Sequence, residues 1–257
     1  MEKVVGIILI LSCNKHKETR LKEFGPKKKI YNGYKVIKVI GDLFLDRDYI
    51  IKENVMYVKC EDSYLHLLKK LALSIKYLYE NFIIEAGILR CGDDLIFDEN
   101  ILNKFLISEK YDFYGQSGPT FYGKNCVCNN INKLKNVRYD PFMLEYYINH
   151  LSELNDPKHG INLNINELKK YLIRPNIWGA SGVIYYISNK SCQIIVDTFD
   201  KINYNIFHLD EFTNSYPYII EDVGVTFIMY YNGINFINST IFYDEHNSIA
   251  KHTNKYK

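Results

Sequence analysis

Long apolar runs are missing from this 257-residue sequence. A helix that spans a bilayer needs about 20 apolar residues in a row, and the apolar stretch at residues 4–11, VVGIILIL, is far shorter. Glu2 precedes that stretch, which makes it a poor signal peptide. The motif ILSC at residues 10–13 is faintly similar to a lipoprotein cleavage site, but its residues fit a buried first strand better. We therefore expect a soluble, cytoplasmic protein without an integral membrane segment.

The sequence is also poor in cysteine, and its charge is nearly balanced. Of six cysteines, only Cys126 and Cys128 lie close together, and no second pair or nearby histidine stands at zinc-site spacing. Free thiols in a reducing compartment are therefore expected. A formal net charge of +2 gives no indication of a nucleic-acid or membrane partner. The sequence also has no Ser-His-Asp or Cys-His arrangement whose local pattern indicates a hydrolase.

Hydrophobic residues, in contrast, are abundant. They make up 47% of the chain, with 15% aromatic residues, which is typical of a folded globular protein. The length is sufficient for a sizeable core, and no internal repeat is visible. We expect a single domain over residues 1–257.

The first half alternates apolar strands with helices. A helix beginning near Asp62 or Ser63, either of which can cap it, shows apolar residues at helical spacing through Leu78. Asp98 begins a second helix. Strands are expected at residues 4–11, 35–42, 54–58, 88–91 and 111–115. The alternating lysines of 35–42 favour an exposed strand. This order predicts an α/β fold with a mainly parallel central sheet flanked by helices.

The second half has a less regular pattern. Residues 117–140 are rich in Gly, Asn and Lys and indicate a long loop. Further elements are expected as a helix at 164–172, a strand at 183–187, a helix at 190–199 capped by Ser188, and a helix at 221–231 that ends at Asn232-Gly233.

An acidic corner follows the apolar run at residues 88–91, which predicts the end of a strand. Asp93 and Asp94 stand between two apolar runs, and adjacent carboxylates are costly to bury without a cation. Their oxygens suit Mg²⁺ or Mn²⁺, especially where a phosphate supplies further ligands. Two solvated turn residues are the alternative interpretation.

Two further clusters lie in the second half. Glu221 and Asp222 open the last helix, where they either carry chemistry or simply complement the helix dipole. Trp178, the only tryptophan, stands among small residues that include Gly182. These leave room for the flat face of a ligand, although a core tryptophan beside glycine turns explains the pattern equally well.

Four blocks together resemble the inverting glycosyltransferases of the β-1,3-galactosyltransferase and Fringe type, which have a GT-A fold. Residues 62–70, DSYLHLLKK, are similar to the family's Asp-Ser-Tyr-x-Asn-Leu-Thr-x-Lys block. Residues 90–97, RCGDDLIF, resemble its Lys-x-Asp-Asp-Asp-x-Phe metal motif. Residues 178–187 stand where the family has a Gly-rich stretch and a Tyr-rich strand, and residues 221–223 match its Glu-Asp-Val block. The blocks occur in the family's order and span nearly the whole chain.

The resemblance implies a hexosyltransferase that uses a UDP-sugar donor, a Mn²⁺ or Mg²⁺ ion and a glycan or glycoprotein acceptor. It also implies a nucleotide-sugar-binding half at residues 1–116 and an acceptor-binding, catalytic half at residues 117–257. Asp222 matches the general base, and Asp94 matches a metal ligand together with a C-terminal histidine, for which His252 is favoured over His246. The implied donor-binding residues are Ser12, Arg20, Asp62, Tyr64, Lys70 and Asp93. The implied acceptor-binding residues are Trp178, Gly182 and Glu221.

Three departures from the family pattern qualify this resemblance. Gly92 replaces the first acid of the metal motif, and Gly224 follows the Glu-Asp-Val block where many relatives have an aromatic residue. The sequence also begins at the first strand without the family's usual membrane anchor, which favours a bacterial or viral enzyme. A non-catalytic sugar-nucleotide or glycan-binding module is the main alternative, and a nucleotidyltransferase ranks below it because no Gly-rich triphosphate loop follows the first strand.

Overall fold

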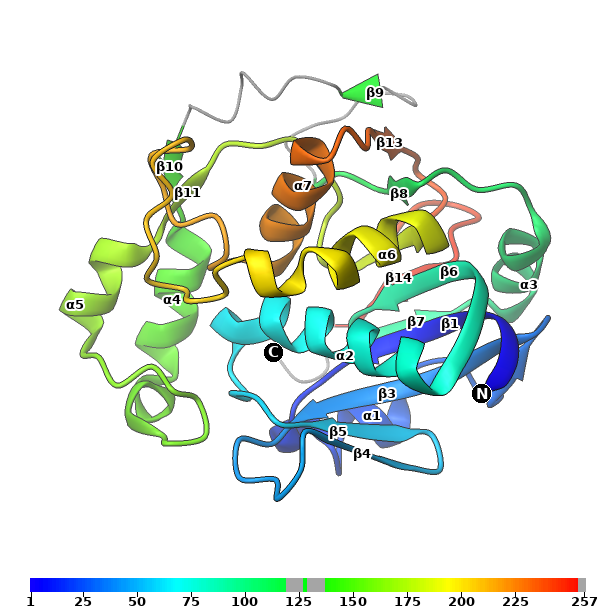
Figure 1. Cartoon of the computed structure of the whole chain (residues 1–257), viewed down its shortest axis with the longest axis horizontal. Helices are drawn as coiled ribbons and strands as arrows, with labels where there is room; N and C mark the ends of the chain where they lie inside the picture. The colour runs from blue at the N-terminus through cyan, green and yellow to red at the C-terminus, as the bar shows by residue number, and fades with distance from the viewer. Residues whose placement is uncertain (119–126, 129–136, 254–257) are drawn as a thin grey trace.

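The computed structural model describes residues 1–118, 127–128 and 137–253, and in this part the chain forms a mixed α/β structure around one large sheet (Figure 1). The sheet has the strand order β4 (Tyr49–Lys52), β5 (Val55–Val58), β3 (Tyr34–Gly41), β1 (Glu2–Leu11), β6 (Phe82–Cys91), β12 (Ile184–Ser188), β8 (Phe113–Gly115), β13 (Phe236–Asn238) and β9 (Val127–Cys128), with β2 (Ile30–Tyr31) beside β3.

The centre of this sheet is parallel. β5, β3, β1 and β6 are parallel neighbours, whereas β12 is antiparallel to both β6 and β8. The expectation of an α/β fold with a mainly parallel central sheet is confirmed. The chain builds outward from β1 through β3 to β5 and then crosses to β6 on the other side of β1. This reversal makes the gap between β1 and β6 a topological switch point, the usual ligand position in such sheets.

Helices cover both faces of the sheet (Figure 1). α2 (Leu67–Asn81), α6 (Asn189–Asp197) and α7 (Glu221–Tyr231) share one apolar core with the sheet. α1 (Arg20–Glu23) and α3 (Glu99–Ile107) contribute to the core on the other face. Most of the expected apolar stripe is buried, but Leu67 is only half-buried and Tyr64, before α2, is exposed. α7 has the bounds expected from the sequence.

A third apolar cluster lies beside the sheet. It is formed by α4 (Pro141–Asn149), α5 (Ile165–Leu168) and the 3-10 segments η4 (Leu151–Asn155) and η5 (Lys169–Tyr171). These elements lie between β10 (Val137–Tyr139) and β11 (Ile173–Pro175) in the sequence, and the two strands form an antiparallel pair. Neither α4 nor this strand pair was expected. Much of the loop expected at 117–140, including residues 119–126 and 129–136, lies outside the described residues.

Two local expectations were wrong. The strand with alternating lysines, β3, is interior because it pairs with both β1 and β5. Both strand lysines find partners: Lys35 Nζ pairs with Glu2 Oε2 at 2.7 Å, and Lys38 Nζ donates to the Leu21 carbonyl at 2.5 Å. Neither Asp62 nor Ser63 caps the helix that follows, which begins as η2 (Tyr64–His66). The Asp62 carboxylate accepts other backbone and side-chain donors instead, and Ser63 Oγ is 2.6 Å from His66 Nδ1.

Other local expectations are confirmed. Asp98 caps α3 by accepting from Asn100 and Ile101, and Ser188 caps α6. Cys13, Cys60, Cys91 and Cys192 are free thiols, while Cys126 lies outside the described residues. No helix in the part of the chain that the structure describes combines the length and apolar character needed to cross a bilayer.

Candidate functional site

The candidate site lies where β1 and β6 end, at the switch point of the sheet. Ser12 directly follows β1, and Gly92, Asp93 and Asp94 follow β6. Ser12 Oγ donates to Asp93 Oδ2 at 2.6 Å, so a buried hydrogen bond joins the two strand ends. The two neighbouring strands thus place the serine and the acidic corner together, as their parallel pairing requires.

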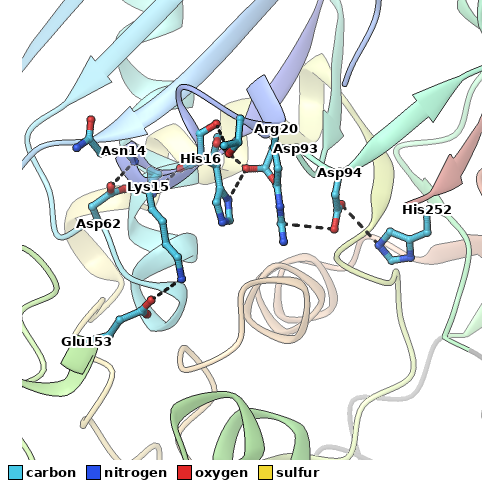
Figure 2. A network of polar contacts seen from close by, with 12 residues as sticks. Asn14, Lys15, His16, Arg20, Asp62, Asp93, Asp94, Glu153 and His252 are labelled. Carbon is cyan, nitrogen blue, oxygen red and sulfur yellow. Dashed lines mark hydrogen bonds and ion pairs between the residues drawn. The ribbon is translucent and has the colours of Figure 1, made fainter. Parts of the chain in front are cut away.

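Asp93 is the centre of a polar network from the segment after β1 (Figure 2). Besides Ser12, His16 Nδ1 lies 2.8 Å from Asp93 Oδ2 and Arg20 Nη1 lies 3.2 Å from Oδ1. Burial alone would raise the pKa of Asp93, but the hydrogen bonds from His16 and Ser12 outweigh it and lower that pKa. Burial lowers the pKa of His16, but the hydrogen bonds with Asp93 and Cys13 outweigh burial and raise that pKa from 6.5 to about 9. Asp93 is therefore a charged, paired group and not a solvated turn residue.

Asp94 is more open and faces the C-terminal segment. β7 (Leu95–Phe97) pairs antiparallel with β14 (Ala250–His252), which sets His252 opposite Leu95. His252 Nε2 lies 3.7 Å from Asp94 Oδ1, and Arg20 Nη1 lies 3.6 Å from Asp94 Oδ2 (Figure 2). Of the two candidate histidines, His252 is the one that the structure brings to Asp94.

Asp94 and His252 are compatible with a divalent cation. Their side chains are 17% and 30% exposed, and the 3.7 Å separation of Oδ1 and Nε2 is compatible with binding to one ion. Among the described residues, no three His, Cys, Asp or Glu side chains form a complete ligand set. An ion at this position would thus take its remaining ligands from phosphate and water, which is common for Mg²⁺.

Asp62 and Lys70 hold the segment after β1. Asp62 Oδ1 accepts from Lys70 Nζ at 2.6 Å and from the Gly41 amide at 3.0 Å, and Oδ2 accepts from the Asn14 amide at 2.8 Å. Lys70 is completely buried and also donates to the Ser12 carbonyl at 2.8 Å. Burial works against the charge of Lys70, but Asp62 raises its pKa. Lys70 has no surface for a donor substrate, so the prediction of direct contact is corrected: it positions Ser12 and Asp62.

Tyr64 stands between the two acidic clusters. It is 48% exposed, and its ring lies 5.6 Å from the ring of Tyr146 on α4. Desolvation of the hydroxyl, followed by the charge of Asp222, raises the pKa of Tyr64 to about 12. Its hydroxyl therefore stays protonated at neutral pH and can donate a hydrogen bond.

The second acidic cluster reaches the first through one short segment. The Gly182 amide donates to Asp222 Oδ2 at 2.7 Å, and the next residue, Val183, accepts from the Gly92 amide at 2.8 Å. A Cβ atom at Gly182 would lie 3.3 Å from Asp222 Oδ2, and one at Gly92 would lie 3.2 Å from Asp94 Oδ1. Residues 182–183 thus lie against both acidic clusters, which therefore share one end of the sheet.

The predicted acceptor residues Glu221 and Trp178 are less accessible than Asp222. Glu221 is 4% exposed, pairs with Arg90 at 2.8 Å and accepts from the Tyr185 hydroxyl, so the prediction that it contacts an acceptor is corrected. Trp178 packs edge-on against Phe236 at 5.7 Å, beside the apolar core. Those contacts favour the core-tryptophan interpretation, and an acceptor role for Trp178 stays a prediction.

Two residues of this site were missed from the sequence. His16 lies in the short η1 (Asn14–His16) after β1, where its only signal was a polar residue beyond a strand end. Arg90 lies inside β6, in a block where attention fell on the acids. No known family model matches the chain, and no curated protein sequence matches it.

Proposed function

We propose that the protein is a metal-dependent, inverting glycosyltransferase of the GT-A type that transfers a sugar from a UDP-sugar to a hydroxyl of a glycan or glycoprotein. One observation carries the proposal. Asp93 and Asp94 at the end of β6 and Asp222 at the start of α7 lie at the same end of the sheet, joined through residues 182–183. This end contains the switch point between β1 and β6, where α/β sheets usually bind nucleotides.

The donor side of the site offers positive charge for a diphosphate. Arg20 lies within 3.2 Å of Asp93 and 3.6 Å of Asp94, and His16 carries a proton at neutral pH because of Asp93. These cations can turn toward phosphate oxygens that approach the acidic corner. A divalent cation held by Asp94 and His252 would neutralise the charge that develops on the leaving UDP.

The acceptor side offers one oriented base. Asp222 is half-buried, and backbone amides of Gly182 and Val223 each donate to one of its oxygens, at 2.7 and 2.8 Å. Each carboxylate oxygen keeps a further lone pair, which can accept the proton of an acceptor hydroxyl. As that proton leaves, the hydroxyl oxygen attacks the anomeric carbon opposite the departing diphosphate. One such displacement inverts the anomeric configuration and needs no protein nucleophile.

A non-catalytic sugar-nucleotide-binding module is the second candidate. The position of Arg20 favours it, because one guanidinium lies close to both carboxylates of the acidic corner and balances their charge without a metal. Such a module would bind a UDP-sugar and never release UDP from it.

The first experiment measures thermal stability with a panel of nucleotide sugars, each with and without Mn²⁺. Wild-type protein should gain stability with UDP and with one UDP-sugar only when Mn²⁺ is present, and Asp94→Asn should lose this gain. Glu109→Gln is the control and should behave as wild type, because Glu109 is exposed and precedes β8, at the end of the sheet opposite to the site. No response to any uridine nucleotide would refute the donor assignment. UDP release from the selected UDP-sugar then separates an enzyme from a binding module.

A further inference from the structure

Arg90 occupies a place where a charge is unfavourable. It lies in the central strand β6 between β1 and β12, opposite Tyr185, and its side chain is 4% exposed. A buried guanidinium is tolerated only when its donors are paired with oxygens of good geometry. The partners of Arg90 therefore show what the position is for.

Those partners lead directly toward Asp222. Arg90 Nη2 lies 2.8 Å from Glu221 Oε2, and Nη1 donates to the Gly182 carbonyl. The guanidinium carbon lies 5.5 Å from the centre of the Tyr185 ring, and the Tyr185 hydroxyl donates to Glu221 Oε1. Glu221 is thus held from two sides, and Arg90 spans from the start of α7 to residue 182.

Gly182 connects this pair to the proposed base. Its carbonyl accepts from Arg90, and its amide donates to Asp222 Oδ2 at 2.7 Å. A Cβ atom here would lie 3.3 Å from Asp222 Oδ2, which is an unusually close approach, and 3.6 Å from Glu221 Oε2, which is ordinary contact. Both groups are attached to the Gly182 Cα atom. By holding the carbonyl, Arg90 therefore restricts the backbone that carries the amide.

We propose that Arg90 and Glu221 are positioning residues, whose buried ion pair fixes Gly182 so that its amide holds the Asp222 carboxylate toward the acceptor hydroxyl. This inference rests on the proposed function of Asp222. An apolar pair of similar volume could stabilise the fold equally well, since buried ion pairs contribute little net stability. The forked guanidinium, however, binds Glu221 and the Gly182 carbonyl at the same time through two nitrogens, which an apolar side chain cannot do.

The test uses the double variant R90M/E221Q, which leaves no unpaired charge in the core. The matched control is D140N/R174M, because Arg174 Nε pairs with Asp140 Oδ2 at 2.6 Å with side chains 10% and 5% exposed. Four quantities are measured in the whole 257-residue chain: the rate of amide hydrogen exchange at Gly182, the Kd for UDP with Mn²⁺, and the kcat and KM for UDP release from the selected UDP-sugar.

The inference predicts a divided result. In R90M/E221Q the Gly182 amide should exchange at least tenfold faster and kcat should fall at least tenfold, while KM for the donor and the Kd for UDP change less than twofold. D140N/R174M should keep wild-type kcat and Gly182 protection. Unchanged kcat or Gly182 exchange in a folded R90M/E221Q variant would overturn the inference and leave the proposed function standing. A wild-type protein that releases no UDP from any UDP-sugar would overturn both.

Discussion

The two acidic pairs, Asp93-Asp94 and Glu221-Asp222, divide their work in the same way. In each pair the first acid is buried and paired with a cation, at 7% and 3% side-chain exposure. The second acid is more open and lies beside the groups proposed to act on substrates. Adjacent side chains leave a turn or a helix start in different directions, so one acid can anchor the backbone while its neighbour faces the site.

The pairs differ in where their cations come from. Asp93 is held by His16 and Arg20, which belong to the irregular segment after β1. Glu221 is held by Arg90, which belongs to the interior of the central strand β6. The first arrangement can rearrange when a phosphate arrives, whereas the second is fixed by the sheet. This difference fits the proposed function, in which the donor site binds and releases UDP and the proposed base keeps one orientation.

The largest expected effect separates Asp222 from Glu221 by activity. Asp222→Asn should reduce kcat for sugar transfer about 10²–10⁴-fold, the usual contribution of a general base, because the amide cannot accept the acceptor proton. Its melting temperature and Kd for UDP with Mn²⁺ should stay as in wild type. Steady-state kinetics check this, and activity within threefold of wild type would remove Asp222 from the mechanism.

A substitution of Glu221, the buried acid of the second pair, tests its role through the free energy of unfolding. Glu221→Ala leaves Arg90 buried without its ion-pair partner, which typically costs about 3–5 kcal/mol. Urea unfolding should show this loss, whereas Asp222→Ala should lose less than about 1 kcal/mol, as is usual at partly exposed positions. Equal losses in the two variants would show that the two acids do not divide these roles.

A pH series probes η2, the segment that contains Tyr64 and His66. Burial lowers the pKa of His66 from 6.5 to about 4, so the unfolded chain binds its proton first on acidification. The stability that neutral His66 contributes is fully present above about pH 6.5 and is lost as the pH falls toward 4. By pH 5 the loss in unfolding free energy should be about 2 kcal/mol. Unfolding of wild type and His66→Gln between pH 5 and 7 measures it. A parallel pH dependence in both proteins would contradict this assignment.

The smallest expected effect concerns the two histidines near the C-terminus. His252→Gln should abolish the Mn²⁺-dependent rise in melting temperature with UDP, a rise of about 2–4 °C per kcal/mol of binding free energy. His246→Gln should retain the rise, because only His252 is paired with the β7 end beside Asp94. The reverse outcome would move the proposed metal ligand to His246.

Local patterns were sufficient for many of the elements, although not for α4 or the β10–β11 pair, and they were not sufficient for the roles of the site residues. The helix Glu221–Tyr231 and the caps at Asp98 and Ser188 follow from short-range sequence, so they could be predicted. The deep burial of Lys70 and the path from Arg90 to Asp222 depend on packing between elements distant in sequence. The role of Glu221 was mistaken for the same reason, since its neighbour in sequence faces the site and its partner comes from another strand.

The central proposal is that a sugar is transferred at this end of the sheet. The decisive measurement is UDP release from UDP-sugars by wild type and Asp222→Asn, with Mn²⁺, a panel of glycan acceptors, and analysis of the product's anomeric configuration. We predict that wild type releases UDP in a metal-dependent reaction with inversion, and that Asp222→Asn loses this UDP release. Release with retained configuration, or no release from any UDP-sugar, would contradict this prediction.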